Sequence, residues 1–439
     1  MWWMSWVLTR LPRQLGRVDV LVVGGGCAGV NAAVAAGRRG ARVLLVEREA
    51  TLGGVSSGVL DTFYGFWTPG DKPQRVVDGI PGEIVRRLAS NGAAFERPNT
   101  YGAGMGVTYN PEVLRVLYDR LCDDADVEVL FHSALVDVEM DAGKVGKVLL
   151  VSGTSLMSLE AAKVIDASGD AAAVALAGGD CEEWSDITSP QSLTAPFTMS
   201  PVSSSVDEVS REDLRAAMEA AAATGRFELP RRDGSIHRTT VDGARFVHMT
   251  RVADRNPLDP VALSLAERDG RRQVLEYASF LREYVRGFEH AQIAWMSRRI
   301  GVRESRRVRG RHWLTRDDVI AGATFPDGVV QAGAPIEDHG TGPDTRWEFL
   351  NEGRIYEIPF RSLLPIDVED MVVAGRCLSA SHDAHASARN MAQCMAMGQA
   401  AGTAAAMAAD LGVAVANVDP MKLRSELVKD GALLRSGTT

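Results

Sequence analysis

Apolar residues along positions 18–46 are grouped in the order strand, helix, strand. Residues 18–23 form a short run rich in Val, as expected for a parallel strand that is covered on both faces. Residues 28–36 are almost all small and predict a slim helix, and residues 41–46 form a second apolar run after Gly40. This order predicts an α/β protein built on a parallel sheet.

The same kind of periodicity predicts further elements along the chain. In the first half these are a helix, a glycine-rich loop, a helix that begins at an Asn-Pro pair, three short strands of a β-meander, and a strand that ends in a small turn: residues 76–89, 101–109, 110–124, 127–131, 135–140, 145–151 and 163–170. In the second half they are a helix, two strands, a long helix, a strand and an apolar helix: residues 211–223, 227–251, 271–299, 366–376 and 391–409. In the last helix, Gly398 and Gly402 are four positions apart, which predicts close packing on the first helix.

Three glycines stand between the first strand and the first helix. Gly24, Gly26 and Gly29 have the spacing G-x-G-x-x-G; the first permits a tight turn, the second lets the backbone approach a diphosphate, and the third lets the helix lie close to the sheet. The free N–H groups at the start of that helix also favour a diphosphate. Glu47, 18 residues after Gly29, can accept a hydrogen bond from a ribose 2′-OH. The pattern predicts a dinucleotide site, and the other interpretation is a glycine turn that serves only packing.

The residues after the second strand indicate which dinucleotide binds. Arg48 and the pair Gly53-Gly54 resemble the second half of the FAD fingerprint in the glutathione reductase-like flavoproteins. An NAD dehydrogenase has no need of this loop, so FAD is predicted. No His or Cys occurs between Ala28 and Leu121, so a covalent link through this region is excluded and we expect FAD to bind non-covalently.

The composition mainly excludes certain classes of partner and location. The 439 residues suffice for two domains, and a formal charge of -9 argues against nucleic acid or an anionic membrane as the main partner. Five cysteines without a C-x-x-C pair favour free thiols in a reducing compartment. No run of 18 apolar residues occurs, so we expect a soluble, cytoplasmic protein. The tryptophan-rich leader, residues 1–17, and the apolar helix would allow a homodimer.

Seven sequence motifs together resemble one family. They are VGGGCAG, LGG, VDGIPGEI, VIDASGDA, GVRESRR, VAGRCLSASHDAHASAR and CMAMGQAAG, spread from about Val18 to Ala409. They resemble the FAD-dependent oxidoreductase family of the glutathione reductase-like class, a neighbour of the fumarate reductase flavoproteins. The resemblance implies that a C-terminal strand, turn and helix return to the cofactor, with the helix N-terminus aimed at the flavin pyrimidine. These motifs are specific for FAD and not for a substrate.

The motifs and the resemblance together define the expected architecture and cofactor site. The fold class is α/β, with a Rossmann-like FAD-binding domain of parallel sheet, β-meander and helices, and an inserted α+β substrate or cap domain. The expected divisions are a leader (1–17), the first segment of the FAD-binding domain (18–185), the cap (186–359), and the second segment of the FAD-binding domain with the C-terminal helix (360–439). The expected cofactor residues are Gly24, Gly26, Cys27, Ala28, Gly29, Glu47, Arg48, Gly53, Gly54, Gly169, Gly375, Arg376, Met391 and Ala392.

Two segments supply candidates for proton transfer and substrate binding, and no metal site is predicted. The resemblance places His382 and His385 near the reactive edge of the flavin, where a histidine can take a proton while a hydride moves to flavin N5. Arg389 could bind a substrate carboxylate or balance charge at the pyrimidine. Residues 303–311 hold five arginines, and Arg306 is our candidate to turn inward and clamp an anion. The simpler interpretations are histidines hydrogen-bonded within an ordered loop and a solvated basic face.

Three functions fit these features. The leading hypothesis is an FAD-dependent dehydrogenase or reductase that transfers a hydride between flavin N5 and a small organic substrate, for which the arginines favour an anion. The second is a flavin monooxygenase, and the third is an electron-transfer subunit with no substrate and no pocket of its own. No second G-x-G-x-x-G stands between a strand and a helix, so we expect no separate NAD(P)H-binding domain; the sequence leaves the electron donor or acceptor open. His339, in a turn, could line the same cavity.

Overall fold

Seven strands form the central sheet of the computed structural model, which describes residues 12–141, 144–351 and 353–435. The strand order is β6-β2-β1-β9-β8-β7, and β20 also pairs with β9. Five of these strands run parallel, whereas β8 and β7 are antiparallel to their neighbours. The bounds are β1 Arg13–Val23, β2 Val43–Val46, β6 Val127–Leu130, β7 Ala134–Asp141, β8 Lys144–Ser152, β9 Ser155–Asp166 and β20 Met371–Val373.

The sheet confirms the strand predicted from the Val-rich run and corrects the predicted β-meander. Val20, Leu21 and Val22 are fully buried, as expected for a strand covered on both faces. The first strand of the expected meander, β6, instead pairs with β2 in parallel. The meander consists of β7, β8 and β9, because β9 is longer than predicted and its first half pairs with β8.

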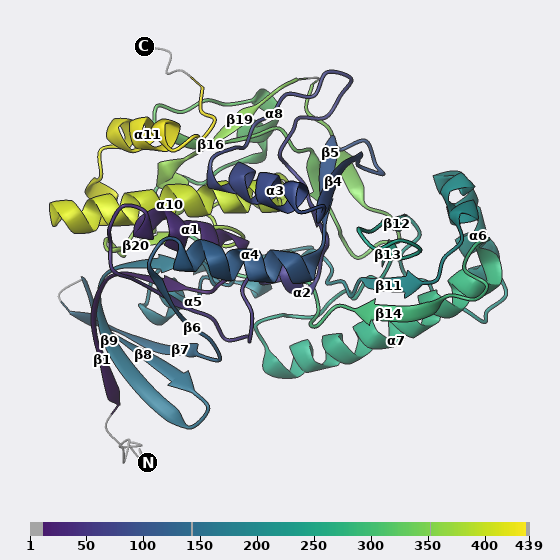
Figure 1. The fold of residues 1–439 in the computed structure, drawn as a ribbon, viewed down its shortest axis with the longest axis horizontal. Helices are drawn as coiled ribbons and strands as arrows, with labels where there is room; N and C mark the ends of the chain where they lie inside the picture. Colours follow the sequence, from purple (N-terminus) through teal and green to yellow (C-terminus); the bar gives the residue numbers. More distant parts are fainter. Residues whose placement is uncertain (1–11, 142–143, 352, 436–439) are drawn as a thin grey trace.

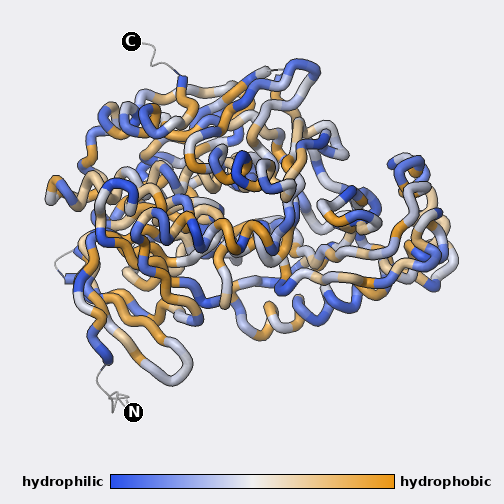
Figure 2. Tube along the Cα trace, in the orientation of Figure 1, coloured by the Kyte–Doolittle hydropathy of each residue, from blue (hydrophilic) through white to orange (hydrophobic). Residues whose placement is uncertain are grey.

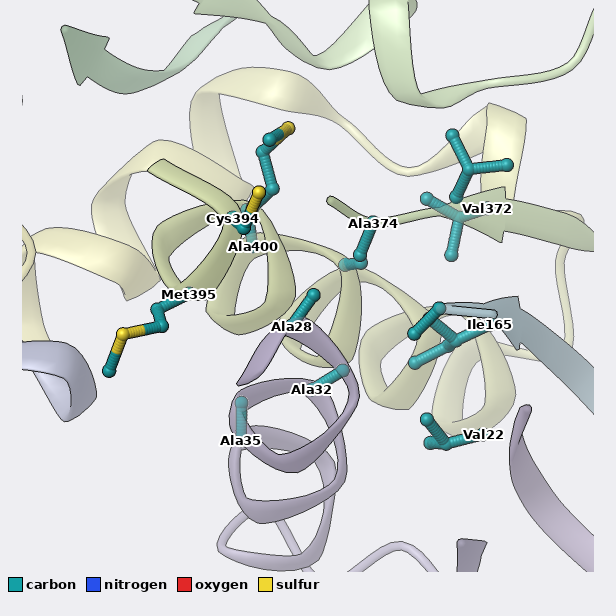
Figure 3. Close-up of a cluster of buried hydrophobic side chains, with 14 of the residues drawn as sticks. Val22, Ala28, Ala32, Ala35, Ile165, Val372, Ala374, Cys394, Met395 and Ala400 are labelled. Atoms are coloured by element: carbon teal, nitrogen blue, oxygen red, sulfur yellow. The ribbon is translucent and has the colours of Figure 1, made fainter. Parts of the chain in front are cut away.

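Helices α1 and α10 pack against each other and contact the central strands. Their bounds are Cys27–Gly37 and Met391–Leu411. A Cβ atom at Gly398 or Gly402 would collide with the backbone of Ala28 or Ala32 in α1. The two glycines therefore allow the close helix contact that their spacing predicts. Figure 3 shows the small side chains of α1 beside those of α10 and beside apolar strand residues.

A second layer of helices and a small sheet cover α1. Helix α4 begins as predicted, because the Asn110 side chain accepts hydrogen bonds from the backbone N–H groups of Glu112 and Val113. Residues 105–109, expected to belong to a loop, form a strand that pairs on both sides. The bounds here are α2 Val55–Gly58, β3 Thr62–Phe63, α3 Ile80–Ser90, β4 Ala94–Pro98, β5 Met105–Tyr109, α4 Pro111–Asp123, α5 Ala172–Leu176 and β10 Cys181–Glu182.

A second lobe projects from the first and has its own hydrophobic core (Figure 1). Its buried apolar residues run from Leu193 to Ile300, whereas those from Val308 onward belong to the first core. The second core thus ends earlier along the chain than the expected border at residue 359. The bounds are β11 Phe197–Ser200, α6 Arg211–Ala223, β12 Ser235–Arg238, β13 Arg245–His248, α7 Pro260–Tyr284 and β14 Gln292–Met296.

The predicted helix over residues 271–299 is wrong at both ends. The helix starts at Pro260, where the side chain of Asp259 accepts from a backbone N–H, and it ends at Tyr284. Gly287 then adopts a positive φ of 97°, which an L side chain disfavours. After this turn β14 pairs with β11. Arg299 therefore lies in a loop of the second lobe and not at the end of a helix.

The chain after residue 300 returns to the first core. In Figure 2, apolar residues are concentrated around α1 and the strands beside it. The fold confirms an α/β protein with a parallel-rich sheet and a second domain. No helix in the described ranges is long and apolar enough to cross a membrane. The remaining elements are β15 Arg307–Val308, α8 Arg316–Ala321, β16 Gly328–Ala332, β17 Ile336–Asp338, β18 Arg346–Glu348, β19 Tyr356–Pro359, α9 His382–Ala388, α11 Pro420–Lys429, and the 3₁₀ helices Trp184–Asp186, Ser204–Glu208, Phe360–Leu363 and Val415–Asn417.

The beginning of the leader, residues 1–11, lies outside the described residues. Residues 13–17 of the leader belong to β1, which begins at Arg13 and pairs with β9.

Candidate functional site

One cavity of about 340 Å³ is lined by residues of both cores. The first core contributes the turn from β1 to α1, the end of β2, the turn after β9, residues 374–376 after β20, and the start of α10. The second lobe and the segments near it contribute Arg231, His248 and the stretch from Arg299 to Arg303. The cavity therefore opens where the carboxyl ends of parallel strands meet a helix N-terminus, as in nucleotide-binding α/β folds.

The three glycines of the motif have different roles. Gly24 has a positive φ of 96°, and a Cβ there would come within 2.7 Å of the Ala167 carbonyl oxygen. A Cβ at Gly29 would overlap the backbone of Gly24. A Cβ at Gly26, in contrast, would meet no described atom within 4 Å, and Gly26 lines the cavity. The absence of a side chain at Gly26 therefore leaves space for a ligand and is not required by packing within the protein. The diphosphate of FAD fits such a position.

The start of α1 and the end of β2 complete this cradle. Gly26 is the N-cap of α1, and within the described ranges no side chain caps this helix. Its first N–H groups are therefore free to bind an anion. Glu47 is 6% exposed and lines the cavity; its Oε2 accepts from the Gly25 N–H at 2.7 Å and its Oε1 from the Glu49 N–H at 2.8 Å. These bonds fix the carboxylate beside the glycine turn.

Most of the predicted cofactor residues line this cavity. They are Gly24, Gly26, Cys27, Ala28, Glu47, Arg48, Gly54, Gly169, Gly375, Arg376 and Met391. The other three support the site without lining it. Gly29 packs on Gly24, the Gly53 N–H donates to the Gly25 carbonyl at 2.7 Å, and the Ala392 N–H donates to the Tyr64 carbonyl at 3.1 Å.

The C-terminal segment meets the same cavity, in agreement with the resemblance. Arg376 Nη2 forms an ion pair with Asp170 Oδ1 at 2.7 Å, and its Nη1 donates to the Val302 carbonyl at 2.9 Å. Asn390 and Met391, at the start of α10, also line the cavity. The N-terminus of α10 therefore offers backbone N–H groups to the cavity that holds the Gly26 cradle.

His385 and His382 belong to α9 and lie outside the cavity lining. His385 is fully buried, and its Nε2–H donates to the Arg376 carbonyl at 2.9 Å. Burial, followed by the charge of Arg307, lowers the pKa of His385 well below its ordinary value. Nδ1 of His382 lies 3.0 Å from the buried carboxylate of Glu304. The geometry thus favours the simpler interpretation, that both histidines are structural.

The inward guanidinium expected from residues 303–311 is Arg303 and not Arg306. Arg303 is 8% exposed and lines the cavity. Arg306 instead binds Glu183, with 2.6 Å between Nε and Oε1. Arg307 is buried in ion pairs with two glutamates. Only a portion of the arginine run is therefore available to a ligand.

Six arginines line the cavity; three of them, Arg231, Arg303 and Arg389, lie near one another, and two of these three lack a carboxylate partner. Arg231 is paired with Asp233 at 2.6 Å. Arg303 donates to the Ser192 carbonyl at 2.5 Å, and Arg389 donates to Gln191 Oε1 at 2.7 Å. Among the residues that the structure describes, neither Arg303 nor Arg389 has a carboxylate within ion-pair distance. Burial, followed by the charges of Arg231 and Arg389, lowers the pKa of Arg303 well below its ordinary value, and an anion bound here would reduce this repulsion.

Two histidines and one carboxylate complete this end of the cavity. Arg303 Nη2 lies 3.0 Å from His248 Nε2; because arginine can only donate, this ring nitrogen accepts. Burial is the main cause that lowers the pKa values of His248 and His339 well below the ordinary value, so both rings are neutral. His339 Nε2 donates to Glu337 Oε1 at 2.9 Å. Glu337 also lines the cavity.

Sequence reasoning considered His339 but missed Arg231, His248 and Glu337. These residues belong to no motif, and they come together only when the second lobe packs on the first core. For this end of the cavity the one local signal was the arginine run at residues 303–311. The sequence did not show which of its side chains turns inward.

The diphosphate cradle and the polar cavity in front of it place this protein among the flavin-binding oxidoreductases. Residues 19–427 match the family described as FAD dependent oxidoreductase, and the chain belongs to that family. The protein is thus an FAD-dependent enzyme, and the residues around Gly26 fit this cofactor.

Individual relatives match only sections of the chain. Fumarate reductase (cytochrome) of Shewanella frigidimarina is 31% identical over 126 residues, which is 29% of this chain and 20% of the relative. Aklavinone 12-hydroxylase of Streptomyces peucetius is 37% identical over 93 residues, 17% of this chain and 19% of the relative. The chain thus spans about a fifth of these curated relatives. A geranylgeranyl bacteriochlorophyll reductase-like structure from Thermoplasma acidophilum has a TM-score of 0.46 at 14% identity, covering 94% of this chain and 84% of that one.

Proposed function

We propose that this flavoenzyme acts on a small organic anion, whose carboxylate is held by Arg303 and Arg389. The observation that carries the proposal is that both guanidiniums line the cavity and, among the described residues, neither is paired with a carboxylate. Arg231 is neutralised by Asp233, and His248 and His339 are uncharged. A ligand carboxylate would supply the missing negative charge and accept charge-assisted hydrogen bonds.

The reaction we propose is the transfer of two electrons between this anion and FAD. When bound, FAD supplies a centre that accepts or returns a hydride at N5. For substrate oxidation, a carbon atom loses a hydride and the adjoining hydroxyl or acidic group loses a proton. Glu337 is our candidate to receive that proton, because it lines the cavity and its carboxyl group is hydrogen-bonded to His339. For reduction of a substrate, both transfers run in reverse.

Hydroxylation with O₂ is the alternative reaction, and the known relatives support it at least as well. The 37% identity to aklavinone 12-hydroxylase concerns a protein whose name states this chemistry. An anion clamp would serve such an enzyme equally, since it positions the substrate and not the oxygen. An electron-transfer subunit without a substrate is less well supported, because the cavity carries a set of charged and polar side chains. Membership of the glutathione reductase-like class stays a prediction.

Anaerobic reduction of the FAD-loaded protein tests the proposal. We expect one class among a panel of small carboxylates to bleach the flavin absorbance near 450 nm without NAD(P)H, and the corresponding uncharged amides or esters to fail. Bleaching by the carboxylate alone indicates a dehydrogenase. The hydroxylase alternative is tested with enzyme reduced by dithionite in the presence of the same carboxylates: on admission of O₂, oxygen incorporated into the carboxylate indicates a hydroxylase, and hydrogen peroxide without incorporation speaks against it. Equal bleaching by carboxylates and by their neutral analogues would overturn the anionic substrate.

A further inference from the structure

Arg299 extends from the second lobe to the cofactor cradle of the first core. It lies in the loop after β14 and lines the cavity together with Gly26, Arg48 and Gly54. A Cβ placed on Gly54 would lie 3.3 Å from Arg299 Nη2 and 3.1 Å from the Gly26 Cα. The guanidinium therefore stands next to the backbone that a diphosphate approaches at the start of α1.

The charge of Arg299 is poorly neutralised by the protein itself. Its ion-pair partner is Glu49, whose Oε1 lies 3.9 Å from Nη1, beyond hydrogen-bonding distance. Burial, followed by the positive charge of Arg48, lowers the pKa of Arg299, and the charges of Glu47 and Glu49 offset this only in part. Two arginines thus face the same region of the cavity, and an anion between them would relieve their repulsion.

The loop that carries Arg299 is held on both sides. The Arg298 N–H donates to the Gly58 carbonyl at 2.9 Å, which ties the loop to α2 in the first core. The Ile300 N–H donates to Glu267 Oε1 at 2.7 Å, and Gly301 exchanges hydrogen bonds with Thr194, both in the second lobe. Arg299 is therefore positioned by its backbone and does not depend on a ligand to reach the cradle.

We propose that Arg299 binds the diphosphate of FAD, so that one group of the cofactor is held by residues of both cores. Helix α1 and the glycine turn supply backbone N–H groups, and the second lobe supplies the guanidinium. FAD binding then joins the second lobe to the first core. This inference concerns the cofactor alone and is independent of the substrate proposed above.

Ligand affinities of the flavin-free full-length protein test the role of Arg299. For Arg299→Ala we expect the Kd values of both FAD and ADP to rise by a similar factor, roughly 10- to 150-fold, as for loss of a hydrogen bond to a charged group. Arg299→Lys should restore some of the affinity, since it keeps the charge but not the planar fork. The matched control is Arg298→Ala, because Arg298 is the adjacent arginine and is exposed; its Kd values should equal those of the wild type.

Salt dependence and stability separate ligand binding from a structural role. The affinity of the wild type for ADP should fall with added salt more steeply than that of Arg299→Ala, because one charge contact is lost in the variant. The melting temperature of the flavin-free protein should be unchanged or higher in Arg299→Ala. Two results would overturn the proposal: FAD and ADP affinities equal to the wild type, or a loss of FAD affinity with ADP affinity intact, which would place Arg299 on another region of the cofactor.

Discussion

His339 donates its Nε2–H to Oε1 of Glu337 across 2.9 Å. The other ring nitrogen, Nδ1, lies 3.1 Å from Thr345 Oγ1, which in turn accepts from Arg251 Nη2 at 3.0 Å. Because His339 is neutral and its one N–H is given to Glu337, Nδ1 must accept from Thr345. The chain of hydrogen bonds therefore fixes both the tautomer of His339 and the direction of the Glu337 carboxylate.

Replacement of Glu337 tests its role in proton transfer. In Glu337→Gln we expect the rate of anaerobic flavin reduction by substrate to fall roughly 10²- to 10⁴-fold, the usual contribution of a general base. The Kd of FAD should be unchanged, because the amide has the same shape. Stopped-flow absorbance of the flavin measures this rate.

The control for this experiment is Glu369→Gln, which removes an exposed carboxylate. His339→Gln should give an intermediate rate, since Glu337 is kept but its orienting donor is changed. Reduction of Glu337→Gln at the wild-type rate would show that the proton goes elsewhere.

We expect Arg303 and Arg389 to lower the stability of the ligand-free protein and to bind the carboxylate of the substrate. In Arg303→Met we expect the affinity for a carboxylate substrate to fall by about 2–5 kcal/mol, as when one partner of a buried charge pair is removed. The free energy of unfolding without ligand should not fall, because a buried guanidinium that repels its neighbours is lost. Flavin difference spectra during titration with simple carboxylates measure the first effect, and denaturant unfolding measures the second.

Arg306→Met is the matched control, because it alters the same arginine run at a side chain paired with Glu183 outside the cavity. Its carboxylate affinity should equal that of the wild type. If both variants lose affinity equally, the effect comes from net charge and not from a clamp.

Local sequence determines the regions of this molecule that could be predicted. The strand–glycine–helix order at residues 18–46 indicates the diphosphate cradle, because the glycine turn and the helix N-terminus lie within one β–α–β unit, although Gly24 also closely approaches Ala167 after β9. The Asn110 cap sets the start of α4 in the same local way. The prediction of a helix over residues 271–299 was wrong because the aromatic residues of that stretch fit helical spacing. Residues 292–296, which are exposed or half-buried, instead form a strand that pairs with β11. There a long-range strand partner outweighs the local pattern.

The substrate end of the cavity was beyond local reasoning. Arg231, His248, Arg303 and Glu337 come from separate segments of the chain and meet only through the packing of the two cores. An arginine run identifies basic residues, but burial decides which of them stays unpaired. His385 illustrates the reverse case, since its position in a family motif drew attention while full burial leaves it hydrogen-bonded to a backbone carbonyl.

Substitution by alanine should have different effects at two of the three glycines of the motif, Gly26 and Gly29. Gly26→Ala places a Cβ in open space toward the cavity, so we expect an unchanged melting temperature without flavin. FAD should bind more weakly by about 1–3 kcal/mol, the usual cost of overpacking. Gly29→Ala places its Cβ on the Gly24 backbone and should lower the melting temperature. Calorimetry and flavin fluorescence measure these two quantities. A loss of stability in Gly26→Ala with normal FAD affinity would show that the motif serves packing alone.

Acid should destabilise the folded protein already below about pH 6.5, the pKa of an unperturbed histidine. Burial is the main cause that lowers the pKa values of His237, His248, His339 and His385. As pH falls below 6.5, these histidines bind protons in the unfolded chain but not in the folded protein, so the unfolded state is favoured. Each such histidine removes about 1.4 kcal/mol of unfolding free energy per pH unit, until its own folded pKa is reached.

Urea unfolding of the flavin-free protein at several pH values between 7.5 and 5.5 measures this slope. His385→Gln should reduce the slope by about 1.4 kcal/mol per pH unit, because one proton fewer is taken up on unfolding. His290→Gln, which removes an exposed histidine, is the matched control. If stability were constant over this range, the buried histidines would have to be protonated in the folded state; Nε2 of His248 could then no longer accept from Arg303, and the hydrogen bonding of the anion site would need to be assigned anew.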